Sequence, residues 1–95
     1  MITRIVKITL LPEKINAFID VFNESSEQIK SFKGCRNAML VRDICHEHIL
    51  FTISEWDDES YLNLYRDSSF FAEVWKKAKT TFAEKATAWS VAKIS

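Results

Sequence analysis

The first ten residues alternate between apolar and polar side chains, a period typical of a strand with one buried face. One face of the extended chain would carry Ile2, Val6, Ile8 and Leu10, with Arg4 interrupting it, and the other face would carry Ile5. The pattern predicts a strand over residues 2–10. Because charge runs through the whole segment, we do not expect it to be a signal peptide.

The period then changes to that of an amphipathic helix. Pro12 fits a first helical turn, where no N–H is needed, and Glu13 suits the positive end of the helix dipole. Helical spacings predict a buried stripe of Ile15, Phe18, Ile19, Phe22 and Ile29, with Ser26 completing the row. The solvated side would carry Asn16, Asp20, Asn23, Glu24 and Glu27. Gly34 tolerates a positive φ without cost and is expected to end the helix.

Three more segments with strand periodicity follow. Residues 36–42 and 48–56 flank a short polar gap, which predicts an antiparallel hairpin. The segment TAWSVAKIS, residues 87–95, predicts a last strand.

A helical segment that is broken in two separates the hairpin from the last strand. The break is predicted near residues 66–69. Asp57 or Asp58 would cap the first part, and Ser68 or Ser69 would cap the second. The buried stripe of the second part would be Phe71, Val74, Trp75, Ala78 and Phe82.

The order of these elements, β-α-β-β-α-β, predicts a ferredoxin-like α+β fold, with an antiparallel four-stranded sheet and helices on one face. A chain of 95 residues has room for one domain, residues 1–95. Such a sheet needs only one apolar face, yet three predicted strands are apolar on both. In the strand over residues 36–42, Met39 and Val41 lie opposite Ala38 and Leu40. In the strand over residues 48–56, Ile49, Phe51 and Ile53 lie opposite Leu50 and Trp56. In the last strand, Trp89 and Val91 lie opposite Ala88, Ala92 and Ile94. We therefore expect a homodimer whose sheets pack face to face.

Composition excludes some classes of partner. Thirteen basic residues balance thirteen acidic ones, which argues against a nucleic-acid partner. The only locally basic stretch, WKKAK, fits the solvated face of a helix. No apolar run reaches the ~18 residues of a membrane helix, so no membrane partner is expected. Two cysteines without an export signal suggest free thiols and a cytoplasmic protein.

The stretch DICHEHIL, residues 43–50, gathers both histidines, one cysteine and two carboxylates. Alternation would point His46 and His48 to the same side. Zinc sites need three or four protein ligands, and Cys35 should lie at the far end of the hairpin. We therefore predict turn chemistry here and no metal site. A histidine acting as a general base would need an adjacent pocket, and a hairpin tip makes a poor floor for one.

A series of aromatic side chains follows the hairpin. Its members are Trp56, Tyr61, Tyr65, Phe70, Phe71, Trp75 and Trp89. Buried Trp and Tyr need partners for their polar groups, and some of these rings must belong to the core. Rings that line a break between two helices would also form an apolar pocket for a flat ligand, so both interpretations stay open.

Four segments carry a resemblance to a known family: ITRIVKITLLPEKINAFIDVF, FKGC, FTISEWDDESYLNLYRDSSFF and AWSVAKI. Together they make essentially the whole chain resemble the antibiotic biosynthesis monooxygenase (ABM) domain family, within the dimeric α+β barrel group. The resemblance implies a homodimer and a substrate pocket between the helices and the sheet of each subunit. Some members oxidise polycyclic aromatic substrates with O₂ and no metal or prosthetic group, and others degrade haem.

The site of the haem-degrading branch transfers poorly. The resemblance places that branch's Asn near Val6, its Trp at Tyr65 and its His ligand at Trp75. The only ring nitrogen of tryptophan is a donor and cannot ligate iron, so a histidine-ligated haem is not implied here. No cofactor is expected.

The resemblance implies a cofactor-independent monooxygenase acting on a small flat aromatic substrate, polycyclic or quinone-like. Tyr65 would be its acid–base group, and Arg66 or Arg4 would stabilise developing negative charge. The pocket walls would be Trp56, Phe70 and Trp75, with Val6, Tyr61, Phe71 and Trp89 as further substrate contacts. The alternative is a non-catalytic dimer of the same fold that binds or senses a small ligand. A purely structural dimer, whose rings are all core, is the third hypothesis.

Overall fold

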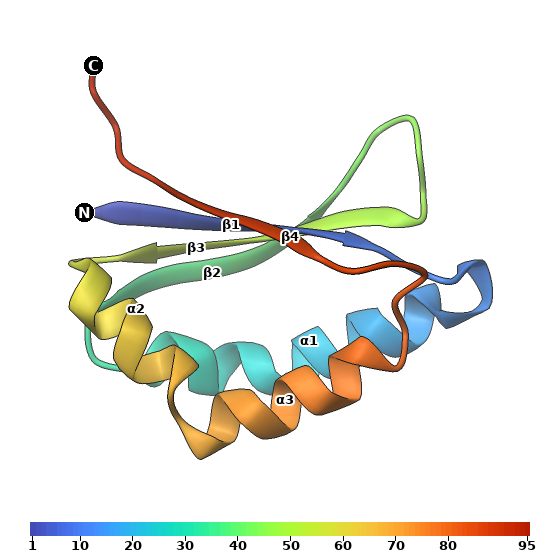
Figure 1. The fold of residues 1–95 in the computed structure, drawn as a ribbon, viewed down its shortest axis with the longest axis horizontal. Coiled ribbons are helices and arrows are strands. Elements are labelled where there is room, and N and C mark those ends of the chain that lie inside the picture. Colours follow the sequence, from blue (N-terminus) through green and yellow to red (C-terminus); the bar gives the residue numbers. More distant parts are fainter.

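The sheet forms one layer, and all the helices lie on one side of it (Figure 1). The structure, a computed structural model, describes residues 1–95. Its strands are β1 (Ile2–Thr9), β2 (Cys35–Arg42), β3 (Ile49–Trp56) and β4 (Thr87–Val91). Its helices are the 3-10 helix η1 (Pro12–Lys14), α1 (Ile15–Ser31), α2 (Glu59–Arg66) and α3 (Ser69–Lys79). The strand order is β2-β3-β1-β4, all neighbours are antiparallel, and the predicted ferredoxin-like α+β fold is confirmed.

The first three strands each differ from the predicted range by one residue at one end, and two other boundaries differ by more. Pro12 opens the short η1 rather than α1, which begins at Ile15. The last strand is shorter than residues 87–95, because β4 ends at Val91. Its only neighbour is β1, and Val91 already pairs with Thr3 near the start of that strand. Beyond this point almost no partner strand remains to hold a ladder.

The buried stripe of α1 contains Ser25 instead of the predicted Ser26. Ser25 is buried and Ser26 is only half-buried. Ser25 lies seven residues after Phe18 and four before Ile29, so helical geometry puts it on the line joining those two buried residues. Its hydroxyl donates to the Val21 carbonyl at 2.8 Å, which satisfies the polar group inside the helix.

A side chain caps each half of the broken helical segment. The Asp58 carboxylate accepts a hydrogen bond from the Ser60 N–H at 3.1 Å and caps α2. The Ser68 hydroxyl accepts from the Phe71 N–H at 3.1 Å and caps α3. Each cap is one of the two residues that the sequence proposed for it.

Gly34 sets the turn between α1 and β2. Its φ is +85°, a conformation that costs glycine little and other residues more. A Cβ at this position would lie 2.3 Å from Cγ of Tyr61. The Tyr61 ring therefore packs directly onto the glycine backbone, and α2 can approach the start of β2 only because no side chain stands there.

The core between sheet and helices has two parts. One is made of Ile8, Leu10, Phe18, Leu50 and Ala78. The other is made of Ile29, Ala38, Trp56, Leu62 and Tyr65. Residues of both parts line a common cavity, so the two parts of the core are separated by an open space instead of forming one continuous packed core.

No helix covers the opposite face of the sheet (Figure 1). The register aligns one apolar row across all four strands on this face: Met39, Ile53, Ile5 and Trp89. Val41 and Phe51 pair in the neighbouring row. Met39 and Trp89 keep 42% and 45% of their surface exposed, so the row is open to solvent in a single chain. The prediction that both sheet faces are apolar is confirmed.

None of the helices combines the length and the apolar composition that crossing a bilayer requires.

Candidate functional site

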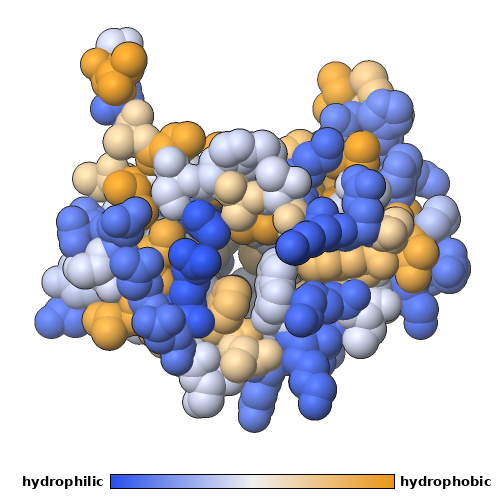
Figure 2. All heavy atoms as spheres, viewed as in Figure 1, coloured by the Kyte–Doolittle hydropathy of each residue, from blue (hydrophilic) through white to orange (hydrophobic).

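The cavity lies between the inner face of the sheet and the helices, with a volume of about 280 Å³. It is visible as a hollow in the molecular surface (Figure 2). Apolar side chains form most of its lining. Its aromatic members are Phe18, Phe22, Tyr65, Phe71 and Trp75, and its polar members besides Tyr65 are Arg4, Arg66, Ser25, Thr52 and Ser54. A concave apolar site with a few placed polar groups is the usual form of a small-molecule site.

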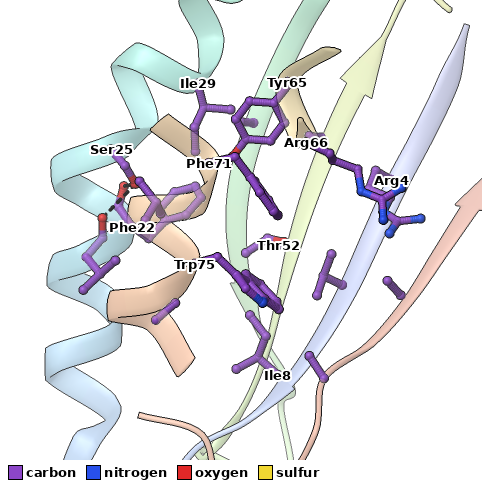
Figure 3. Close-up of a pocket in the computed structure, with 18 of the residues that line it drawn as sticks. Arg4, Ile8, Phe22, Ser25, Ile29, Thr52, Tyr65, Arg66, Phe71 and Trp75 are labelled. Carbon is purple, nitrogen blue, oxygen red and sulfur yellow. Dashed lines mark hydrogen bonds between the residues drawn. The ribbon is translucent and has the colours of Figure 1, made fainter. Parts of the chain in front are cut away.

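A chain of ring contacts forms one side of the cavity. The rings of Trp56 and Tyr65 stack with centroids 5.2 Å apart. Phe71 meets the Tyr65 ring edge-on at 5.1 Å and stacks with Trp75 at 5.7 Å, with only 13° between the last two planes. Both Phe71 and Trp75 line the cavity from α3 (Figure 3). The result is an aromatic wall whose rings are held in fixed orientations, with Phe71 and Trp75 nearly parallel to one another.

Trp56 does not line the cavity, but its ring packs against the Tyr65 ring of this wall. It is completely buried at the end of β3, and its Nε1 donates to the Ser54 hydroxyl at 2.9 Å. The indole has its polar partner and its packing surface, so its ring orientation is fixed. Trp56 in turn fixes the Tyr65 ring that stacks on it.

Tyr65 lies on α2 with its side chain almost entirely buried. Burial is the main reason that its pKa rises from 10.0 to about 12, and the nearby Cys35 thiol adds to the shift. The hydroxyl makes no hydrogen bond within the chain, yet no buried side-chain oxygen or nitrogen lacks a partner. The oxygen therefore keeps some accessible surface, and Tyr65 is one of the residues that line the cavity. At neutral pH it carries its proton, so Tyr65 is able to donate a hydrogen bond, and the base role considered from sequence is disfavoured.

Two arginines reach the cavity from different elements. Arg4 comes from β1 and Arg66 from the end of α2, and their side chains run toward one another at the cavity edge (Figure 3). The pKa of Arg4 is lowered, chiefly by burial and then by the positive charge of Arg66, while Glu59 acts in the opposite direction. Arginine remains protonated at neutral pH despite such a shift.

Neither of these arginines forms a salt bridge. The ion pairs of the structure join Lys30 to Glu27 and Arg36 to Asp57. The one side-chain hydrogen bond of the Arg4 guanidinium is donated by Nη1 to the Ser90 hydroxyl at 3.0 Å. The cavity edge thus carries two positive charges, neither in a salt bridge, and the negative side chain that acts on Arg4, Glu59, lies outside the lining.

The candidate residues from the sequence divide into two groups. The cavity lining contains Arg4, Val6, Tyr65, Arg66, Phe71 and Trp75. Outside the lining lie Trp56, Tyr61, Phe70 and Trp89. Phe70 borders an open polar groove between α1 and α3, and Trp89 lies on the uncovered face of the sheet, opposite Ile5.

Sequence reasoning missed the hydroxyls of Ser25, Thr52 and Ser54, which line the cavity. Thr52 and Ser54 alternate with Phe51 and Ile53 and so share a face with the buried Leu50 and Trp56. Two hydroxyl residues on the buried face of a strand were the signal that could have identified them.

The histidine-rich stretch forms the tip of the β2–β3 hairpin. The Asp43 carboxylate accepts hydrogen bonds from the N–H groups of Cys45 and His46 at 2.8 and 3.0 Å. The Cys45 bond is the main cause of a lowered pKa at Asp43. The ring centroids of His46 and His48 lie 6.0 Å apart, neither ring lines the cavity, and no group of three potential metal ligands gathers anywhere. The side chain of Asp43 organises the turn.

Cys35 and Cys45 are both free thiols, as the sequence predicted.

Comparisons with known proteins give a consistent picture. The family model for antibiotic biosynthesis monooxygenases matches residues 1–80. No curated protein matches the chain. Among solved structures, a conserved protein from Methanosarcina mazei Go1 shares 22% identity at a TM-score of 0.92, with 99% of this chain and 94% of the other covered. The structure of an antibiotic biosynthesis monooxygenase shares 18% identity at a TM-score of 0.91, with 100% of both chains covered. The structure of Rv0793 from Mycobacterium tuberculosis shares 13% identity at a TM-score of 0.90, with 99% of this chain and 95% of the other covered. At these identities the structures establish the fold alone.

Proposed function

The chain belongs to the antibiotic biosynthesis monooxygenase family, and from this membership we propose that it is a cofactor-independent monooxygenase acting on a small flat aromatic substrate in the cavity between helices and sheet. The observation that carries the proposal is the composition of that cavity. It combines an aromatic wall with two nearly parallel rings, a protonated Tyr65 hydroxyl and two arginines that form no salt bridge.

The volume of the cavity limits the size of the substrate that it can hold. About 280 Å³ is just below the ~300–1,000 Å³ typical of ligand pockets. This volume favours a one- or two-ring compound, such as a hydroxylated naphthalene or a small hydroquinone, over a large polycycle. The nearly parallel rings of Phe71 and Trp75 suit a flat ligand.

The proposed reaction needs no external reductant. At a ring carbon that carries one hydrogen, the C–H bond is replaced by a C=O bond, and a ring hydroxyl loses its hydrogen to give a second C=O, as when a naphthol becomes a naphthoquinone. One atom of O₂ enters the substrate, and the other leaves as water with the two hydrogens. The substrate anion gives electrons to O₂, a C–O bond forms to make a peroxide, and breaking the O–O bond releases the water oxygen.

The cavity residues would act on charge and position. Arg4 and Arg66 would stabilise the anion that reduces O₂, because both are positively charged at the cavity edge and the charge of Arg4 is partly withdrawn from water. Tyr65 would donate its proton or a hydrogen bond to the oxygen that develops charge as the peroxide breaks. The apolar lining would exclude water from the reactive anion.

A second candidate function is a binding or sensing module that uses the same cavity without turnover. The observation that favours it is the absence of Asp, Glu, His and Lys from the lining. No side chain there would remove a proton from the substrate at neutral pH.

An oxygen electrode distinguishes these functions. We expect O₂ uptake with at least one hydroxylated naphthalene or small hydroquinone, and a fall of roughly 10²-fold or more in Tyr65→Phe, because general-acid groups contribute about that much. Ligand affinity should change little, since the ring stays. Tyr61→Phe is the matched control, because that ring packs on Gly34 outside the cavity. Ligand binding without O₂ uptake in the wild type would identify the binding module instead.

We also propose that the chain acts as a homodimer through the uncovered sheet face. The supporting observation is the apolar row of Met39, Ile53, Ile5 and Trp89, which crosses all four strands. A second copy of the same face would bury this row in an aligned packing of two sheets. A single domain over residues 1–95 and a cytoplasmic location stay predictions.

A further inference from the structure

The charged groups of the cavity are all of one sign. Arg4 and Arg66 are its only ionised side chains at neutral pH, and Tyr65 remains neutral there. The hydroxyls of Ser25, Thr52 and Ser54 complete its polar groups. The cavity can attract a negative charge but has no carboxylate to bind a cation and no base to create an anion.

Of the two arginines outside the cavity, Arg36 is paired with a carboxylate, and Arg42 at the exposed end of β2 forms no salt bridge. Arg36 on β2 forms an ion pair with Asp57, whose carboxylate accepts a hydrogen bond from the guanidinium Nε–H. Arg4 is half-buried, and the charge of Arg66 acts on it more strongly than the opposite charge of Glu59. Neither Arg4 nor Arg66 forms a salt bridge. Like charges placed together in a partly desolvated site cost free energy that an anion would recover.

Structural roles explain each arginine separately but not their convergence. The bond from Arg4 to Ser90 helps to hold β4 against β1. Arg66 lies in the last turn of α2, where a positive charge suits the helix dipole. Neither role requires both side chains to lie at the edge of the same apolar cavity (Figure 3).

We propose that the cavity selects an aromatic ligand that is already an oxyanion, a phenolate or a carboxylate, and holds its negative oxygen between Arg4 and Arg66. The guanidinium groups offer planar N–H donors that match such oxygens. The aromatic body lies along Phe71 and Trp75. The inference rests on the proposed function for its site, and it adds that the ligand arrives ionised rather than being deprotonated by the protein.

Equilibrium binding of two isosteres tests the charge preference. The probes are 2-naphthoate and the neutral 2-naphthamide, titrated at pH 7 by calorimetry against the full chain. We expect the wild type to bind the carboxylate at least tenfold more tightly, a ratio that corresponds to about 1.4 kcal/mol. Arg66→Gln and Arg4→Gln should each remove most of this preference.

Arg42→Gln is the matched control, because it removes the same charge from the hairpin end of β2, outside the cavity lining. Its naphthoate preference should equal that of the wild type. Arg66 is exposed and its replacement should not disturb folding, so that variant keeps the test valid even if Arg4→Gln fails to fold. The melting temperature of Arg66→Gln should stay equal or rise, because a repulsion is removed, whereas a purely structural arginine would leave it lower.

A chromogenic probe tests the phenolate form. The absorbance of 4-nitrophenol reports its ionisation, and we expect the bound compound to ionise at lower pH than the free compound, with the shift reduced in Arg66→Gln. A lower ionisation pH of the bound 4-nitrophenol supports a phenolate ligand. A preference for naphthoate without that change in ionisation assigns the site to carboxylates. Equal binding of naphthoate and naphthamide with no nitrophenol shift, or no binding of any probe, overturns the inference.

These probes are not turned over, so the result is independent of the monooxygenase proposal. An anion preference without O₂ uptake from any substrate would refute the enzyme and leave the inference standing. O₂ uptake that is unaffected by either arginine substitution, together with no anion preference, would refute the inference alone.

Discussion

At the scale of single residues, Tyr65 links stability to chemistry. It stacks on Trp56, meets Phe71 edge-on, lines the cavity, and has a hydroxyl without a protein partner. The same burial that fixes the ring raises the pKa of its phenol to about 12. The residue is therefore suited to give a hydrogen bond or a proton and unsuited to take one at neutral pH.

This pKa shift predicts a loss of stability in alkali. The phenol titrates near 10.0 when unfolded and near 12 when folded, so the folded state holds its proton more tightly. The stabilisation is complete below about pH 10 and is lost as pH rises toward 12. Across that window the free energy of unfolding should fall by about 2 to 3 kcal/mol more in the wild type than in Tyr65→Phe, as measured by urea denaturation. Parallel pH curves for the two proteins would contradict the buried phenol.

At the scale of elements, the break between α2 and α3 positions the aromatic wall. Ser68 joins the two helices, because its hydroxyl donates to the Tyr65 carbonyl at 2.6 Å and accepts from the Phe71 N–H at 3.1 Å. One side chain thus satisfies the end of one helix and the start of the next. Tyr65 and Phe71, whose backbones it links, are both cavity residues.

Substituting this serine should weaken the junction. We expect Ser68→Ala to lower the free energy of unfolding by about 1 kcal/mol, the usual cost of a lost N-cap. Ser69→Ala is the matched control, because Ser69 is exposed and forms no side-chain hydrogen bond, and its effect should stay within about 0.5 kcal/mol. Chemical denaturation measures both. Equal effects of the two substitutions would show that Ser68 does not act as the cap.

At the scale of the whole molecule, the two faces of the sheet have different roles. The inner face and the helices enclose the cavity, and the outer face exposes an apolar row across four strands. A monomer that left such a row uncovered would be prone to association. A symmetric dimer through this face would leave the helices, and the cavity between helices and sheet, free in each copy.

A charge placed in that row should prevent dimer formation. We expect the wild type to have the mass of a dimer in light scattering coupled to size exclusion, and Trp89→Glu to shift it toward the monomer. Leu64→Glu is the control, because Leu64 is a similarly exposed apolar residue on α2, at 67% exposure, on the other side of the sheet. A wild type that is monomeric at micromolar concentration, or a Trp89→Glu dimer, would contradict the proposed interface.

The sequence by itself determined the elements and the faces of the strands. The side-chain alternation of a strand is a local property of the backbone, so the positions of Arg4 and Val6 on the inner face and of Met39 and Ile53 on the outer face could be predicted. Each helix cap could be limited to two adjacent residues, because capping depends on the residue type at the start of the helix, which is also a local property. Helical phase is less strict, and one residue of error exchanged Ser25 for Ser26.

Only the tertiary structure decided which of these residues meet. The aromatic residues looked equivalent in the sequence, yet Trp75 lines the cavity, Trp56 lies beneath it, and Trp89 is on the far face. The approach of Arg66 to Arg4 joins residues 62 positions apart, on α2 and β1. Cavity volume and desolvation are sums over all packed elements, so neither the open space nor the raised pKa of Tyr65 follows from any local pattern.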